Sequence, residues 1–492
     1  MPPTRPRALR LALALFIPAA VAAPPLRAQQ PLTLGDAVTM AESQGLAAHA
    51  AERAREAARQ RDRAFGARLL PRLVMAGTLP SFSRSISPVV QPDGTTLFTP
   101  LRRTDAKLSL GVEQPIPLTG GSLSITSSLD RLQITGAEEV RTWTSTPIAI
   151  TLRQDLFRPN ALRWDAREQD ATLDVAERQY LEAREDVAIR TTEAFFDLYA
   201  ARTALDNASK NVAINDTLYR LNTGRYQVGK IGENDLLQSE LALLRARTSL
   251  DGARLEYDRT LAALRLALGL PVGAPLEIVA PSAVPDVAVD TAVAVAEALR
   301  NQSQPASLEL QRIQARRHVS EAKLNDGFGA SVEASVGFDS PAAPVVGDAY
   351  QNLLQSQRFS LGVELPILQW GARSADTQAA EAELDRVTTT ARLAREEVAQ
   401  QAHFAALQLA QARRTLLLSA KADTVATKRF DVAYNRYVIG KIGIDNLYIA
   451  QSEKDQALQQ YVQALRGYWT SYYRLRRVTL YDFEAGRRIR RP

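Results

Sequence analysis

RYQVGKIGENDL, at residues 225–236, returns 211 positions later as RYVIGKIGIDNL, at residues 436–447, and the two copies share seven of twelve residues. The same offset places PIAITLRQDLF (residues 147–157) over RFSLGVELPIL (residues 358–368). Helix-like and strand-like landmarks therefore recur in one order at one spacing. We interpret the chain as a tandem duplication and expect its function to reside in the repeated architecture.

Residues 1–28 have the composition of a secretory signal peptide. Three arginines precede an apolar run at residues 11–23, and small residues permit cleavage after Ala28, which we favour, or after Ala22. The run is too short to span a bilayer as a helix. Removing residues 1–28 takes away four arginines and no acid, so the formal charge of +6 falls to +2. This balance gives no reason to expect a nucleic-acid partner.

The rest of the chain offers neither a membrane helix nor a covalent cross-link. No stretch after the leader reaches the roughly 18 consecutive apolar residues that indicate a membrane helix. The sequence contains no cysteine, which excludes a disulfide framework and a lipid attached to an N-terminal cysteine. Any membrane anchoring is therefore expected to come from the fold itself.

Helix composition alternates with strand composition in both halves. Segments rich in Ala, Leu, Arg, Glu and Gln predict helices in the first repeat (residues 29–268) at 32–70, 160–228 and 234–268, and in the second repeat (290–478) at 290–325, 373–439 and 445–478. Four prolines mark residues 269–289 as a linker. Residues 479–492 form a C-terminal tail, and we expect its basic end, GRRIRRP at 486–492, to be disordered rather than to bind acidic lipid or cell-wall material.

The helix lengths predict an elongated architecture. Each longer helix would extend about 100 Å at 1.5 Å per residue. The two shorter helices of each repeat, placed end to end, match one long helix in length. Apolar residues at 3-4 spacing from Leu384 to Leu416 add a coiled-coil seam. We therefore predict a mainly α fold in which antiparallel coiled coils form a helical barrel.

Alternation of apolar and polar residues predicts strands between the helices, within residues 72–157 and 330–368. Val332, Val336 and Phe338, for example, alternate with serine, glutamate and glycine. Such a face packs on a core in a soluble sheet or faces lipid in a membrane barrel. No amphipathic helix is left to cover the sheet, so we favour the transmembrane β-barrel.

The first repeat is longer than the second. SLGVEQPI at 109–116 resembles SLGVELPI at 360–367, and comparison of the spacings to the later motif indicates about 40 extra residues. Because each repeat must return to the side from which it entered the membrane, the strand number must be even. We predict four strands in the first repeat, near 72–82, 104–116, 121–132 and 146–157, and two in the second, near 330–339 and 358–368. Three copies would close 18 strands; the alternative keeps 12 and folds the insert outside the bilayer.

These features resemble the TolC family of outer-membrane efflux proteins over essentially everything after the leader. The resemblance rests on the short-long-short helical halves, ARLLPRL at 67–73 before the strands, QDLF at 154–157 and the two RY-x-x-GKIG turns. It implies a homotrimer that shares one barrel in the cell outer membrane and extends a helical tunnel into the periplasm. It also implies three partners, namely outer-membrane lipid, a periplasmic adaptor and an inner-membrane transporter. In that family the tunnel opens when the adaptor and the transporter dock.

The resemblance further implies a gate at the hairpin turns. The family's gating tyrosine falls on Tyr437 and a gate aspartate on Asp235, while the gate arginine falls on Ile442, next to Lys441. Of the two aspartates that form pore rings, one falls on Asn446 and the other on Ile449, so Asp445 is the candidate substitute.

The turns themselves also have a simpler interpretation. A plain helical hairpin explains their glycines, with Asn234 or Asp445 as helix caps. The functional interpretation adds adaptor contact to the same residues, which are Gly229, Lys230, Gly232, Gly440 and Gly443.

Enzyme activity is not expected. The three histidines are isolated and no cysteine is present, so no metal or cofactor site is predicted. We predict a passive exit duct for a tripartite efflux pump or type I secretion system, whose cargo the sequence does not name. The alternative is a periplasmic adaptor or structural coiled-coil protein without a channel, and the repeated strands and hairpins argue against it. A cell-wall hydrolase is a further class, which is disfavoured because the sequence contains no recognisable set of catalytic residues.

Overall fold

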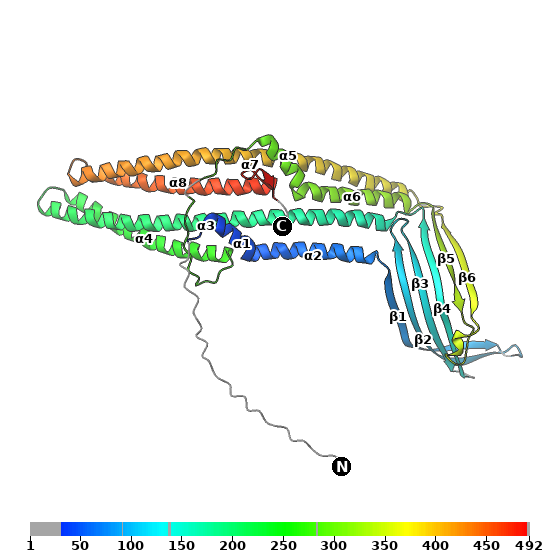
Figure 1. Cartoon of the computed structure of the whole chain (residues 1–492). Helices are drawn as coiled ribbons and strands as arrows, with labels where there is room; N and C mark the ends of the chain where they lie inside the picture. The colour runs from blue at the N-terminus through cyan, green and yellow to red at the C-terminus, as the bar shows by residue number, and fades with distance from the viewer. Residues whose placement is uncertain (1–30, 91, 136–138, 282–283, 490–492) are drawn as a thin grey trace, which may run out of the picture.

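The computed structural model describes residues 31–90, 92–135, 139–281 and 284–489, so the predicted signal peptide lies outside the described residues. Long helices run side by side, and a β-sheet extends from one end of them (Figure 1). The first repeat contains α1 (Leu34–Gln44), α2 (Leu46–Arg68), α3 (Ala161–Gln227) and α4 (Glu233–Ala267). The second contains α5 (Thr291–Asn301), α6 (Ser303–Leu324), α7 (Ala372–Val438) and α8 (Ile444–Thr479).

Two helices predicted as continuous are each broken, so the uninterrupted helices at 32–70 and 290–325 are wrong. The breaks fall at Gly45 and Gln302, whose backbones are extended. A side chain on Gly45 would collide with the carbonyl oxygen of Ala41. At the second break, the buried carboxylate of Glu182 on α3 accepts hydrogen bonds from the backbone N–H and the hydroxyl of Ser303, at 2.7 and 2.9 Å. A group from a neighbouring helix thus caps α6, an arrangement that local sequence does not reveal.

The helix positions measure the insertion in the first repeat. α3 begins at position 161 and α7 at position 372, which is an offset of 211, the same as between the two turn motifs. α1 begins at position 34 and α5 at position 291, which is an offset of 257. From the start of α1 to the start of α3 the first repeat is therefore longer by 46 (257 less 211) than the second repeat from α5 to α7, not by about 40. The smaller value came from aligning residues 109–116 with 360–367, which occupy different positions in the sheet.

Six antiparallel strands form one sheet in sequence order: β1 (Arg72–Val90), β2 (Thr96–Ile116), β3 (Gly121–Thr135), β4 (Glu139–Leu156), β5 (Gly329–Asp339) and β6 (Leu354–Glu364). The first repeat thus has four strands and the second has two, as the sequence predicts. β2 pairs with β1 from Thr96 to Glu113 and with β3 from Arg102 to Ile116, so the insert is part of the sheet, as a protomer of six strands requires. The inserted hairpin is β1–β2, at one edge of the sheet.

The register separates an apolar face from a polar face. Val112, Ile125, Ile150 and Val336 lie side by side on four neighbouring strands. The same face carries further exposed apolar side chains, namely Leu73, Met75, Leu108, Leu110, Ile148, Leu152, Phe338, Phe359, Leu361 and Val363. Figure 1 shows no helix across either face of the described sheet.

Ion pairs between directly opposite residues mark the polar face. They join Arg72 to Glu113 at 2.5 Å, Lys107 to Asp130 at 3.3 Å and Arg153 to Glu333 at 3.1 Å. Serine and threonine occupy many of the remaining positions of this face, for example Ser124 opposite Thr151. The sheet thus has one apolar face and one polar face.

The helices form a layer with two free edges. Far from the sheet, α3 packs between α4 and α8, and α8 packs on α7; nearer the sheet, α3 packs on α2 and α6, and α6 packs on α7. The edges are therefore α2 with α4 on one side and α7 on the other. No helix among the described residues is both long and apolar enough to cross a membrane.

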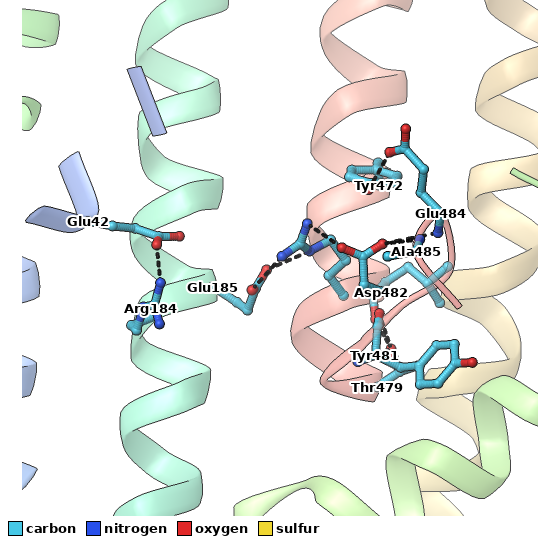
Figure 2. Close-up of polar contacts among 11 residues, drawn as sticks. Glu42, Arg184, Glu185, Tyr472, Thr479, Tyr481, Asp482, Glu484 and Ala485 are labelled. Carbon is cyan, nitrogen blue, oxygen red and sulfur yellow. Dashed lines mark hydrogen bonds and ion pairs between the residues drawn. The ribbon is translucent and has the colours of Figure 1, made fainter. Parts of the chain in front are cut away.

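A buried ion pair ties the two repeats together at mid-length (Figure 2). Arg476 on α8 donates to both carboxylate oxygens of Glu185 on α3, at 3.1 and 3.2 Å, and pairs with Asp482 at 3.4 Å. Burial raises the pKa of Glu185, and the neighbouring Arg476 opposes that shift. Asp482 belongs to a small ribbon of β7 (Tyr481–Asp482) and β8 (Arg487–Arg488). The prediction of a disordered basic end is thus wrong for residues 486–489, and residues 490–492 lie outside the described residues.

Candidate functional site: the helical tip

The two RY-x-x-GKIG segments form the same turn at the end farthest from the sheet (Figure 1). In the first, the N–H groups of Gly229 and Lys230 donate to the carbonyls of Tyr226 and Arg225, at 2.9 and 2.8 Å. The second turn repeats both bonds at the equivalent positions and with the same distances. Gly229 and Gly440 have φ of 71° and 78°, which favours glycine. Both long helices thus end in a Schellman motif.

The helices that follow each turn begin without a side-chain cap. Gly232 and Gly443 occupy the N-cap positions of α4 and α8, and neither helix receives a side-chain cap hydrogen bond. The prediction that Asn234 or Asp445 caps these helices is therefore wrong, because both lie inside the first turn. Glu233, Asp235 and Asp445 instead place negative charge near the positive end of each helix dipole.

Tyr437 lies at the centre of a contact between the two repeats. Its side chain is only 4% exposed, and its hydroxyl donates a 2.6 Å hydrogen bond to Oδ1 of the fully buried Asn222 on α3. The guanidinium of Arg225 lies over the tyrosine ring, 5.2 Å from its centroid. We refer to Asn222, Arg225 and Tyr437 as the latch.

Arg225 also caps the end of α7. Its guanidinium donates to the carbonyl oxygens of Val438, at 2.8 Å, and of Tyr437, at 3.3 Å. These carbonyls belong to the last turn of α7, where the helix dipole favours a positive charge. Arg225 of the first repeat therefore supplies hydrogen bonds to two carbonyl groups at the end of α7 in the second repeat.

Apolar packing surrounds the latch. Leu218, Phe430, Ile444 and Leu447 form a buried cluster with Tyr437. The cluster also contacts Tyr448, whose hydroxyl is buried without a hydrogen-bond partner among the described residues, and burial raises the pKa of this tyrosine. Three helices, α3, α7 and α8, thus meet in one closed contact at the tip.

Within the single chain, the predicted gate residues Asp235, Tyr437 and Lys441 do not bond to one another. Asp235 makes no hydrogen bond or ion pair with any described residue, and Tyr437 binds Asn222 instead. Lys441 is exposed, and the guanidinium that contacts the end of α7 within one chain belongs to Arg225 of the other repeat. Asp445 accepts a 2.6 Å hydrogen bond from Gln238.

The remaining predicted residues lie at the surface of the tip. Asn446 is exposed, and so are all five of the turn residues proposed for adaptor contact: Gly229, Lys230, Gly232, Gly440 and Gly443. Sequence reasoning missed Asn222, Arg225 and Gln238. Arg225 lies inside the quoted motif, but its partner across the fold is visible only in three dimensions.

A family model and several solved structures match this chain. A family model described as "Outer membrane efflux protein" matches residues 37–270. A search of curated proteins gave no match.

Several solved structures share the fold. The CmeC outer membrane channel of Campylobacter jejuni superposes with a TM-score of 0.67 at 16% identity, covering 93% of this chain and 87% of that one. VceC of Vibrio cholerae gives 0.64 at 12% identity, covering 91% and 95%. The open state of the Neisseria gonorrhoeae MtrE outer membrane channel gives 0.62 at 14%, covering 91% and 88%. Residues 37–270 therefore match the outer membrane efflux protein family, and the chain as a whole shares the fold of these outer membrane channels.

Proposed function

We propose that three copies of this chain form an outer-membrane exit duct, through which an efflux pump passes its substrate from the periplasm to the exterior. The observation that carries the proposal is a single chain in which a two-faced sheet is fixed to one end of helices about 100 Å long. At the opposite end, each long helix is joined to the following helix by a turn, and the two turns have the same hydrogen bonds. The duct conducts passively, and its periplasmic mouth lies at the tip.

The sheet has the chemistry of a wall between lipid and water. Its continuous apolar face suits hydrocarbon, and its opposite face carries ion pairs and hydroxyl groups that suit an aqueous lumen. A sheet in lipid cannot keep open edges, because unpaired backbone groups cost several kcal/mol each. β1 and β6 are such edges in the single chain.

Pairing of β6 with β1 of the next copy would keep the antiparallel order and close the ring. Three copies of six strands give 18, against 12 without the inserted hairpin. Because barrel diameter grows with strand number, the proposed barrel is wider than a 12-stranded one. The insert lies at the junction between copies, where it widens the ring without disturbing the helices.

The helix edges support the same arrangement. Among the helices, exposed large apolar residues concentrate on α4 and α7, at the two edges of the helical layer: Leu237, Leu241, Leu244, Leu255 and Leu266 on α4, and Leu393, Phe404, Leu407, Leu417, Leu418, Val425, Val432 and Val438 on α7. A periplasmic adaptor and an inner-membrane transporter are the proposed partners at the tip, where the exposed turn residues offer the contact.

Extraction tests the proposal directly. The protein should appear in the outer-membrane fraction, require detergent, and run as a heat-labile trimer on a mildly denaturing gel. In planar bilayers it should form channels. A detergent-free periplasmic monomer would contradict the proposed function.

A further inference from the structure

The latch occurs once in the chain, although the sequence that builds it occurs twice. The counterparts of Arg225 and Tyr437 at the offset of the duplication are Arg436 and Tyr226. Tyr437 is 4% exposed, whereas Tyr226 is 43% exposed, and Arg436 is exposed with no ion pair among the described residues. Half of a second latch is thus present without a partner.

The apolar residues around the latch show the same asymmetry. Ile214, Leu221 and Tyr448 pack against the buried cluster at the tip. Their counterparts at the same offset are Val425, Val432 and Leu237, and all three are large apolar side chains that are more than half exposed. These counterparts lie on α7 and α4, the two free edges of the helical layer.

We infer that a second copy of this chain completes these sites: Arg436 caps the end of α3 of the next copy and covers its Tyr226, as Arg225 does for α7 and Tyr437 within one chain. In this assembly, α7 packs on the α4 of the next copy in the way that α3 packs on α8 within one chain. The reason is that the duplication makes α7 the counterpart of α3 and α4 the counterpart of α8. Val425 and Val432 of one copy then contact Leu237 of the next. The inference rests on the assembly proposed above.

The two kinds of latch differ in their polar contacts. Ala433 occupies the position equivalent to Asn222, so the neighbour's Tyr226 has no amide to bind. The hydrogen bond from Gln238 to Asp445 is also lost, since its equivalents are Ile449 and Asn234. The contact between α7 of one copy and the α3–α4 turn of the next, which we call the seam, thus keeps the arginine cap and the apolar contact but lacks two hydrogen bonds. We infer that the mouth opens first along the seams between copies, while the two hairpins of one chain stay joined.

Cross-linking tests the contact, because the chain has no native cysteine. The double variant Tyr226→Cys/Ala433→Cys, treated with a short bismaleimide in membranes, should yield covalent trimers on a denaturing gel. The matched pair Asn222→Cys/Tyr437→Cys should react within one chain and run as a monomer. If the trimer forms and the matched pair reacts while the first pair gives no product between subunits, the inferred contact is wrong and the proposed function stands. Absence of any trimer in the membrane would instead refute the proposed function.

Conductance tests the order of opening. Ala433→Asn supplies the missing amide and should lower the open probability of single channels roughly fivefold, the effect expected of one added hydrogen bond. Arg436→Gln should raise it, and Arg436→Lys should retain part of the closure. Unchanged gating in both Ala433→Asn and Arg436→Gln, with trimers intact, would refute the seam as the opening site.

Discussion

Replacing Arg225 by glutamine should open the mouth by releasing α3 from the end of α7. The substitution removes a guanidinium that donates to two carbonyls of the last turn and lies over the Tyr437 ring. Hydrogen bonds of charged groups contribute about 1.5–3 kcal/mol and an exposed cation–π contact about 0.5–1 kcal/mol. Arg225 is only partly buried, so we take about 2 kcal/mol per chain, which is about a 30-fold shift of the local closed-to-open ratio.

Single-channel recording in planar bilayers measures this shift. Arg225→Gln should raise the open probability and the conductance, and Tyr437→Phe, which loses one buried hydrogen bond, should have a smaller effect. Combining the two should give less than the sum of the single effects, because both act on one contact. Arg220→Gln is the matched control: this arginine lies on the same helix, is largely exposed and pairs only with Asp216. Equal behaviour of Arg225→Gln and Arg220→Gln would refute the latch.

Three further predictions address the sheet and the buried ion pair. Ile150→Arg places a charge on the apolar face and should reduce the yield of trimer on gels, because such a charge costs about 2–4 kcal/mol near the membrane centre. Thr151→Arg on the polar face should assemble normally and alter the ion selectivity, which reversal potentials measure. Deleting the inserted hairpin, residues 72–117, should leave a trimer with a narrower barrel, seen as retention of smaller solutes in liposome-swelling assays. Glu185→Gln leaves Arg476 buried and underpaired and should lower thermal stability by about 3–5 kcal/mol, while Glu185→Leu with Arg476→Met should restore most of it.

Local sequence was sufficient for the parts of the fold that obey local rules. The long helices α3 and α7 begin and end within one residue of the predicted bounds, because glycine supplies the positive φ that a Schellman motif requires. The strands followed from alternation of period two, and the parity of membrane crossings favoured six of them. These features depend on residues close together in the chain.

Features that depend on distant residues were missed. The break at Gln302 exists because Glu182, 121 residues away from Ser303, caps the following helix. The latch exists because Asn222 and Arg225 meet Tyr437 across the two repeats. The family resemblance supplied a tyrosine for the gate but placed its partners on Asp235 and Lys441. The repeated motif identified the residues at the turns, but the residues that each of them contacts depend on how the helices pack.

The position of the insertion explains how one repeat could grow without loss of the fold. A hairpin adds two strands, so the chain still returns to the side from which it left, and α3 begins where it would have begun. The offset between α3–α4 and α7–α8 is accordingly undisturbed, and both turns keep the same hydrogen bonds. The number of strands can therefore change while the number of helices stays the same, because the hairpin joins the sheet at its edge. The hairpin meets the helical layer at the end of α2, where Gln114 donates a 2.9 Å hydrogen bond to the carbonyl oxygen of Leu69. In the proposed trimer the barrel can therefore widen by two strands per chain while the helical layer is unchanged, so the latch at the tip acts independently of the width of the barrel.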